Sequence, residues 1–186
     1  MKRLASLLLL GAALLSGCTT PFARYYDQHF SALYERIEVH SAGRQGPVPL
    51  VLRGSPFPDQ SRERLAAAVI AGMSSSAALY PMRLTSADPG PRSVDYRIIV
   101  VFGQPSLGAN GLCAAPDAPF ALDGALNAAA AFCIGDRLLT GVRGRSDVPP
   151  TGPDDPAFHD FVHGLTSSLL PPDNPLHRGC RRLPNC

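Results

Sequence analysis

Residues 94–102, VDYRIIVVF, decide the fold of this chain. Every residue from Ile98 to Phe102 is apolar, so an extended segment here is apolar on both faces. β-Branched and aromatic residues also favour strands. We therefore predict a strand at the centre of a sheet, buried on both sides.

The chain beyond this strand predicts a hairpin. Residues 128–134 and 137–145 form two runs that are rich in apolar residues, and the Gly135-Asp136 pair between them is a known two-residue hairpin connection. The resulting register pairs residues across the hairpin: Phe132 with Leu139, and Cys133 with Leu138.

Residues 103–127, between the central strand and the hairpin, are too many for an ordinary loop. We expect this connection either to be tied down by Cys113 or to contain a short helix near residues 120–125. Loops on a rigid scaffold often carry recognition, so it is also where we expect a binding surface.

Helix signals occur on both sides of the central strand. Residues 59–73 carry an apolar face after either Asp59 or Ser61 as the cap, and Asp155-Pro156 opens a second helix that runs to residue 169. Residues 48–53 and 82–85 have the pattern of two further short strands. Together these elements predict an α+β fold, a mainly antiparallel sheet of four to five strands with two helices on one face.

An apolar stripe precedes this domain. Its members recur at helical spacing: Phe22, Tyr26, Phe30, Leu33 and Ile37. The stripe predicts an N-terminal tether helix. Such a helix either packs on its own domain or lies at lipid headgroups or against a partner.

The first residues, MKRLASLLLLGAALLSGC, have the order of a signal peptide. The apolar run from Leu4 to Leu15 is shorter than the ~20 residues that a bilayer-spanning helix needs. Leu15-Ser16-Gly17-Cys18 resembles the lipobox of bacterial lipoproteins. The resemblance implies cleavage before Cys18, a diacylglyceryl group on its sulfur and an acyl chain, such as palmitate, on its amino group.

The lipobox also sets the expected domain organisation and location. We expect a lipoprotein signal peptide over residues 1–17, a lipid-anchored tether over 18–46, one α+β domain over 47–172 and a disulfide-tied irregular tail over 173–186. Thr19 after the anchor resembles the choice of outer-membrane lipoproteins. We therefore expect the protein to be held in the outer membrane by the lipid on Cys18 and to face the periplasm.

Four cysteines remain besides the anchor: Cys113, Cys133, Cys180 and Cys186. An even number in an exported chain predicts two disulfide bonds, and three pairings are open. We favour the local pairing, Cys113 with Cys133 and Cys180 with Cys186. The absence of a CxxC motif from the sequence argues against redox catalysis and against a zinc knuckle.

The charge of the mature chain argues against nucleic-acid binding. Lys2 is the only lysine, and its removal with Arg3 leaves 15 arginines against 15 acidic residues. Affinity for nucleic acids depends on an excess of positive charge, which this chain lacks.

His159 and His163 are the candidate metal ligands. They stand four residues apart on the last predicted helix, so they share one face and have a spacing that can hold zinc. The segment HDFVH resembles the HExxH motif of zinc proteases, but Asp160 stands where that motif has glutamate. A histidine pair beside an apolar stripe is more often half-exposed surface.

Other catalytic patterns find little support in the sequence. It contains no GxSxG motif for a serine hydrolase and no glycine-rich phosphate loop. The adjacent Asp154 and Asp155 are better explained as a helix cap than as paired catalytic carboxylates. His177 and the arginines that follow it are a solvated terminus or a place that meets phosphate or carboxylate groups.

Three pieces, GSPF at residues 54–57, YRIIVVF at 96–102 and AFCIGD at 131–136, resemble a group of small proteobacterial envelope proteins of uncharacterised activity. The likeness covers about residues 48–172 and implies no catalytic residue. A likeness of shape alone links the layout to auxiliary lipoproteins of lipid transporters.

We therefore predict a non-enzymatic, lipid-anchored envelope protein that binds or supports an envelope assembly and needs no cofactor. Its partner is expected to be another envelope protein. Two alternatives stay open: a metal-dependent envelope hydrolase that uses His159 and His163, and an auxiliary lipoprotein of a transporter.

Overall fold

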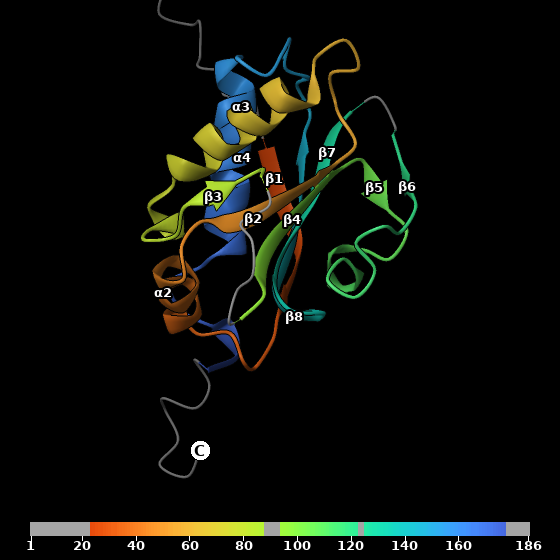
Figure 1. Ribbon diagram of the computed structural model, residues 1–186. Coiled ribbons are helices and arrows are strands. Elements are labelled where there is room, and N and C mark those ends of the chain that lie inside the picture. Colours follow the sequence, from red (N-terminus) through yellow and green to blue (C-terminus); the bar gives the residue numbers. More distant parts are fainter. Residues whose placement is uncertain (1–22, 88–93, 123–124, 178–186) are drawn as a thin grey trace, which may run out of the picture.

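A computed structural model describes residues 23–87, 94–122 and 125–177 (Figure 1). Its elements in chain order are β1 (Ala23–Phe30), α2 (Arg36–Arg44), β2 (Val48–Arg53), α3 (Arg62–Ser74), η2 (Ala77–Leu79), β3 (Leu84–Thr85), β4 (Tyr96–Phe102), β5 (Gln104–Pro105), η3 (Ala109–Gly111), β6 (Phe120–Ala121), β7 (Leu126–Ile134), β8 (Arg137–Ser146), α4 (Pro156–Leu169) and η4 (Pro175–His177).

The main sheet is mixed. In the described part of the chain it has six strands in the order β1-β8-β7-β4-β2-β3, and β2 runs parallel to both β4 and β3. The α+β class is confirmed, whereas the mainly antiparallel sheet of four to five strands is wrong. The reason is that α3 returns the chain between β2 and β3, which lets these strands run in the same direction.

The central strand is confirmed. β4 lies between β2 and β7, and Ile98 and Val100 face one side while Ile99 and Val101 face the other, all of them buried. The continuous apolar run therefore supplies both cores, as a strand covered on both faces requires.

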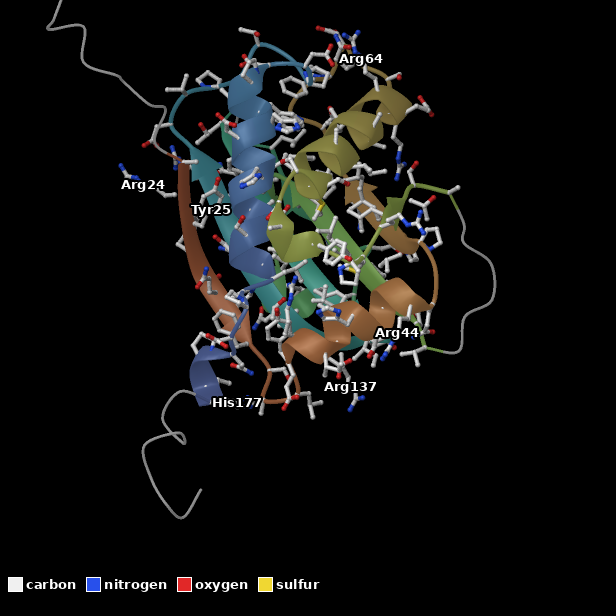
Figure 2. All side chains as sticks on the ribbon, turned by 90° about the vertical axis from the view of Figure 1, so that its left-hand side faces the viewer. Arg24, Tyr25, Arg44, Arg64, Arg137 and His177 are labelled. Atoms are coloured by element: carbon white, nitrogen blue, oxygen red, sulfur yellow. A yellow bond between two sulfur atoms is a disulfide. The ribbon has the colours of Figure 1, made fainter. Side chains whose placement is uncertain are left out.

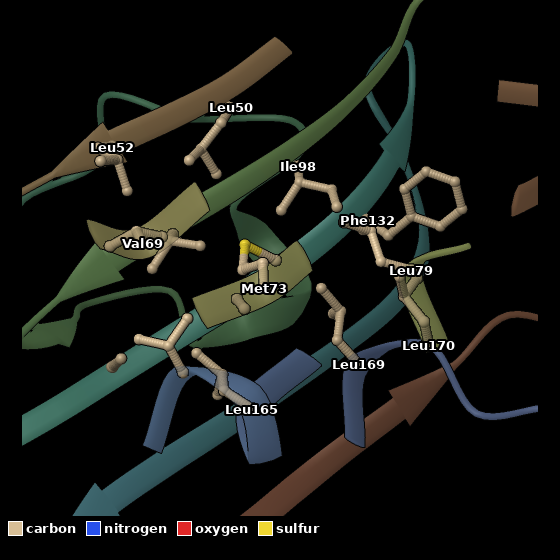
Figure 3. Packing of buried hydrophobic residues seen from close by; sticks show 14 of the residues in the cluster. Leu50, Leu52, Val69, Met73, Leu79, Ile98, Phe132, Leu165, Leu169 and Leu170 are labelled. Atoms are coloured by element: carbon tan, nitrogen blue, oxygen red, sulfur yellow. The ribbon is translucent and has the colours of Figure 1, made fainter. Parts of the chain in front are cut away.

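Helices cover the first face of the sheet (Figure 1). The side chains of α3 and α4 meet the sheet in one buried cluster, which contains Val69, Met73, Leu165 and Ile98 (Figure 3). Both helices begin as predicted at polar caps. The Ser61 hydroxyl accepts the Arg64 N–H at 3.2 Å, which decides between the two proposed caps of α3, and Asp155 caps α4.

The long connection covers the second face. It runs on the side of the sheet away from the helices and carries β5, η3 and β6 (Figure 1). The Cys113–Cys133 disulfide joins it to β7, so the favoured local pairing is confirmed for these two cysteines. Of the two expectations for this segment, the one that ties it down through Cys113 holds, and residues 120–121 form a strand rather than a helix.

The hairpin register is right at the turn and shifts further along. Cys133 lies opposite Leu138 as predicted, but Phe132 lies opposite Thr140, so the expected pairing of Phe132 with Leu139 is wrong. A β-bulge between these pairs is the physical reason, because it adds one residue to β8 and moves the later partners by one.

The predicted tether helix is wrong. Residues 23–30 form β1, which pairs antiparallel with β8, and the helix begins only at Arg36. The physical reason is that β8 offers an open sheet edge, and the aromatic residues of this segment pack well on a strand. Tyr25, which lies outside the predicted stripe, packs on Phe161 and donates its hydroxyl proton to the carbonyl of that residue at 3.0 Å.

Three tyrosines should make the stability of the fold depend on pH in alkaline solution. The pKa of each of Tyr25, Tyr34 and Tyr96 is raised to about 12 from an ordinary value of 10.0, and burial is the largest cause. The neutral phenol is therefore favoured in the folded protein, and its hydroxyl donates, for example from Tyr34 to the Pro171 carbonyl at 2.6 Å. This stabilisation is complete below pH 10 and is lost as the pH rises through 12.

We expect the free energy of unfolding to fall steeply between pH 10 and 12, measured by denaturant titrations followed by circular dichroism. Tyr34→Phe removes one of the titrating groups and should make that fall shallower. An unchanged pH dependence in this variant would contradict the assignment.

Candidate functional site

Several strands begin or end together at one end of the sheet. Ala23 at the start of β1 and Leu126 at the start of β7 both pair with Ser146, while β2 and β4 finish there at Arg53 and Phe102. We call this the groove end. Figure 2 shows Arg24 and Arg64 at this end and Arg44, Arg137 and His177 at the opposite one.

Three neighbouring cavities lie at this end, and we call them together the groove. A polar cleft of about 500 Å³ and an apolar pocket of about 240 Å³ share Ser55 in their walls. A third hollow, of about 530 Å³, shares Gln60 with the polar cleft. The groove thus runs around the loop that leads from β2 into α3.

Two glycines let the β6 segment close over the ends of β2 and β4. Gly54 has φ +70°, and a Cβ there would lie 2.3 Å from the Phe102 carbonyl oxygen and 2.8 Å from the Phe120 ring. Gly103 has φ +111°, and its Cβ would lie 2.5 Å from the Ala121 carbonyl oxygen. Only glycine fits such close approaches at positive φ.

The polar cleft holds two guanidinium groups. Arg53 donates to the carbonyl of Pro116, lies 3.4 Å from the carboxylate of Asp117 and stacks over the Phe120 ring, with 5.4 Å from Cζ to the ring centroid. Arg62 donates to the Leu52 carbonyl at 2.8 Å. Backbone carbonyls thus hold both guanidiniums in place, an arrangement suited to acidic groups because arginine grips carboxylate and phosphate through paired N–H groups.

The apolar pocket is lined by rigid and apolar side chains. Phe57 forms its buried side, where its ring packs edge-on against Phe158 of α4 with 5.1 Å between centroids. Leu122 lies at its rim with 62% of its surface exposed. Four prolines also line it: Pro56, Pro58, Pro149 and Pro150. A pocket of this character accepts hydrocarbon.

The charged groups that line the third hollow are paired with other groups of the protein. Arg64 is paired with Asp154, and Asp155 accepts the backbone N–H groups of Thr151 and Ala157, which lowers the pKa of its carboxyl group. Asp155 is therefore the predicted cap of α4, while Asp154 makes a salt bridge instead of a cap. The groups of this hollow are used in holding the start of α4 against α3.

The candidate metal ligands lie elsewhere, on α4 beside α3. His159 is half-buried and His163 is exposed. His163 Nδ1 lies 2.9 Å from the Ser75 hydroxyl, which in turn donates to the Gly72 carbonyl at 2.7 Å. Within residues 23–87, 94–122 and 125–177 no three or more His, Cys, Asp or Glu side chains are grouped to hold a metal ion. His163 therefore takes part in an interhelical contact in this structure.

The other predicted site residues divide into two sets. Cys113 and Cys133 are joined under the second face of the sheet. Cys18, Cys180 and Cys186 lie outside the described residues, so the anchor and the second disulfide stay predictions. None of the helices in the described ranges is long and apolar enough to cross a membrane.

The sequence patterns did not single out Arg53, Arg62 or Phe120. The available signal was the GSP turn directly after a buried strand, since glycine there often permits a close backbone approach. The partners come from segments more than 60 residues apart, such as Arg53 and Pro116. Local spacing therefore could not bring them together.

Comparison with known proteins gives a distant likeness of shape. No family model matches the chain, and no curated protein matches it. Among solved structures, it is similar to the PelC dodecamer from Paraburkholderia phytofirmans, with a TM-score of 0.41 and 8% identity over 80% of this chain and 99% of that one. A single-substitution variant of the same PelC dodecamer gives a TM-score of 0.39 and 9% identity over 80% and 98%. These values show a distant similarity in fold alone.

Proposed function

We propose that this chain is a lipid-anchored, periplasm-facing envelope protein that binds or supports an envelope assembly without catalysing a reaction. The observation that carries the proposal is the buried Cys113–Cys133 disulfide in a chain whose residues 15–18 resemble a lipobox. Disulfides of this kind belong to oxidising compartments, and the lipobox independently implies export and anchoring.

The charged groups of the groove support binding rather than catalysis. Its charged groups are guanidiniums held by backbone carbonyls and carboxylates committed to a salt bridge or a helix cap. Groups of this kind orient and hold a ligand. A general base or a nucleophile would need a neighbour that activates it.

The sequence predicts a recognition surface on the connection over residues 103–127. One side of this connection is buried against the sheet. Ala109, Leu112 and Cys113 are buried against the sheet, while Leu107 and Leu122 are 50% and 62% exposed. We propose that the exposed side of this connection faces the partner or ligand, with the disulfide holding it in shape.

Metabolic labelling with palmitate tests the anchor. We expect the wild-type protein to take up the label and Cys18→Ala to take up none, because the acyl groups attach only at that residue. Cys113→Ala, which removes a different cysteine, is the matched control and should remain labelled. A wild-type chain without label would overturn the anchored function.

Cross-linking in cells tests the assembly. The wild-type protein, purified from detergent-solubilised membranes, is expected to bring down one stoichiometric envelope partner that the Cys18→Ala variant loses. A labelled, membrane-held protein that brings down no partner would contradict the assembly role and leave the anchor intact. Because the PelC structures are dodecamers, light scattering of the same preparation would also record any self-association.

A further inference from the structure

The polar cleft carries uncompensated positive charge. Arg62 pairs with no carboxylate of the described residues, and its guanidinium donates to the neutral Leu52 carbonyl. Arg53 has Asp117 beside it, but that side chain is 97% exposed and is therefore well screened by water. The charged residues in the cleft wall thus sum to one positive charge, which matches a singly charged phosphodiester.

The apolar pocket neighbours the polar cleft through one shared residue, Ser55. Ser55 lines both cavities, Arg53 lines only the polar one and Phe57 only the apolar one. A ligand that fills both must carry an anionic group next to a hydrocarbon group. This combination describes an amphiphile with a charged head.

The position of the groove brings it close to the anchor. Cys18 precedes Ala23 by five residues, and a fully extended chain of that length reaches at most about 18 Å. Ala23 begins β1 at the groove end, on the same end as Arg24 and Arg64 (Figure 2). If Cys18 is lipidated as the proposed function states, this end must face the membrane surface.

We propose that the groove holds one glycerophospholipid drawn from the membrane. Its phosphodiester lies against Arg53 and Arg62, and part of one acyl chain fills the pocket beneath Leu122 and Phe57. This inference rests on the proposed function for the orientation of the groove. The chemistry of the two cavities selects the lipid, because neither a free phosphate nor an uncharged lipid would use both.

Native mass spectrometry of the full mature protein, purified in detergent, tests the binding. The probe is dioleoyl phosphatidylglycerol; dioleoylglycerol lacks the phosphate, and glycerol phosphate lacks the chains. We expect one phosphatidylglycerol per protein and little of either control compound. Equal binding of dioleoylglycerol would overturn the role of the arginines, and binding of glycerol phosphate alone would mean an anion site without a lipid.

Substitutions locate the site. Arg62→Gln should weaken phosphatidylglycerol binding roughly tenfold, which is about 1.4 kcal/mol, because it removes a charged hydrogen-bond donor to the phosphate. Arg64→Gln, two residues away and paired with Asp154, is the matched control and should leave binding within about twofold.

A second pair of variants changes only exposed side chains. Leu122→Asp alters the pocket rim and should abolish acyl binding, while Leu176→Asp alters a similarly exposed leucine outside the groove and should not. A wild-type protein that takes up palmitate but binds no phosphatidylglycerol would overturn this inference and leave the proposed function standing. A protein without palmitate would instead overturn the function on which it rests.

Discussion

Replacing both Cys113 and Cys133 with alanine is expected to lower the free energy of unfolding by about 3 kcal/mol. The two cysteines are 20 residues apart in sequence, and the entropy that such a crosslink removes from the unfolded chain corresponds to that value at room temperature. Both cysteines are fully buried, so alanine also leaves unfilled space under the second face of the sheet. Denaturant unfolding of the two oxidised proteins measures the difference.

The loss of the disulfide should loosen mainly the segment that covers the second face of the sheet. The disulfide crosslinks the middle of this connection to β7, and noncovalent bonds, such as that from Arg97 of β4 to the Cys113 carbonyl at 2.8 Å, assist it. We expect hydrogen exchange to speed up in this connection, while α3 and α4 keep their protection. The Cys180→Ala/Cys186→Ala variant controls for the loss of two thiols, and uniform exchange changes in the Cys113→Ala/Cys133→Ala protein would contradict a local role.

The elements that could be predicted from the sequence are those determined by local chemistry. β2, β4, the hairpin turn at Gly135 and the cap of α4 at Asp155 all follow from patterns within about ten residues. Continuous apolar runs, turn pairs and a cap followed by proline each have one favourable backbone conformation. Here local and tertiary preferences agree.

The failure at residues 22–37 has the opposite cause. Aromatic residues at steps of three and four fit a helix, but the same residues suit a strand whenever an unpaired sheet edge is present. The open edge of β8 lies more than 100 residues away in sequence and therefore could not enter a local prediction. The missed β1 also hid the position of the groove end relative to the anchor.

The candidate site was less predictable than the fold. Its walls come from the end of β2, the start of α3, the end of the long connection and the loop after β8. In the sequence, an arginine such as Arg53 resembles any other charge at a strand end. Only the tertiary arrangement, which places Phe120 under that guanidinium, gives it a defined position.

Gly54→Ala is expected to lower the free energy of unfolding by about 3 kcal/mol and to open the groove. At φ +70° an L-residue costs about 1–2 kcal/mol, and the added Cβ meets the Phe102 carbonyl at 2.3 Å, which overpacks the site at a further cost of about 1–3 kcal/mol. The carbonyl belongs to the central strand β4 and cannot retreat. The Phe120 ring and the β6 segment must therefore move instead.

Gly135→Ala is the matched control for this substitution. Gly135 also has positive φ, at +54°, but nothing lies within 4 Å of the position that a Cβ would take there. It should lose only the backbone cost of about 1–2 kcal/mol. The difference between the two alanine variants, measured by denaturant unfolding, isolates the cost of the close approach of Phe102 and Phe120 to Gly54. Equal losses would contradict a close approach of Phe102 and Phe120 to Gly54 that the protein cannot relax.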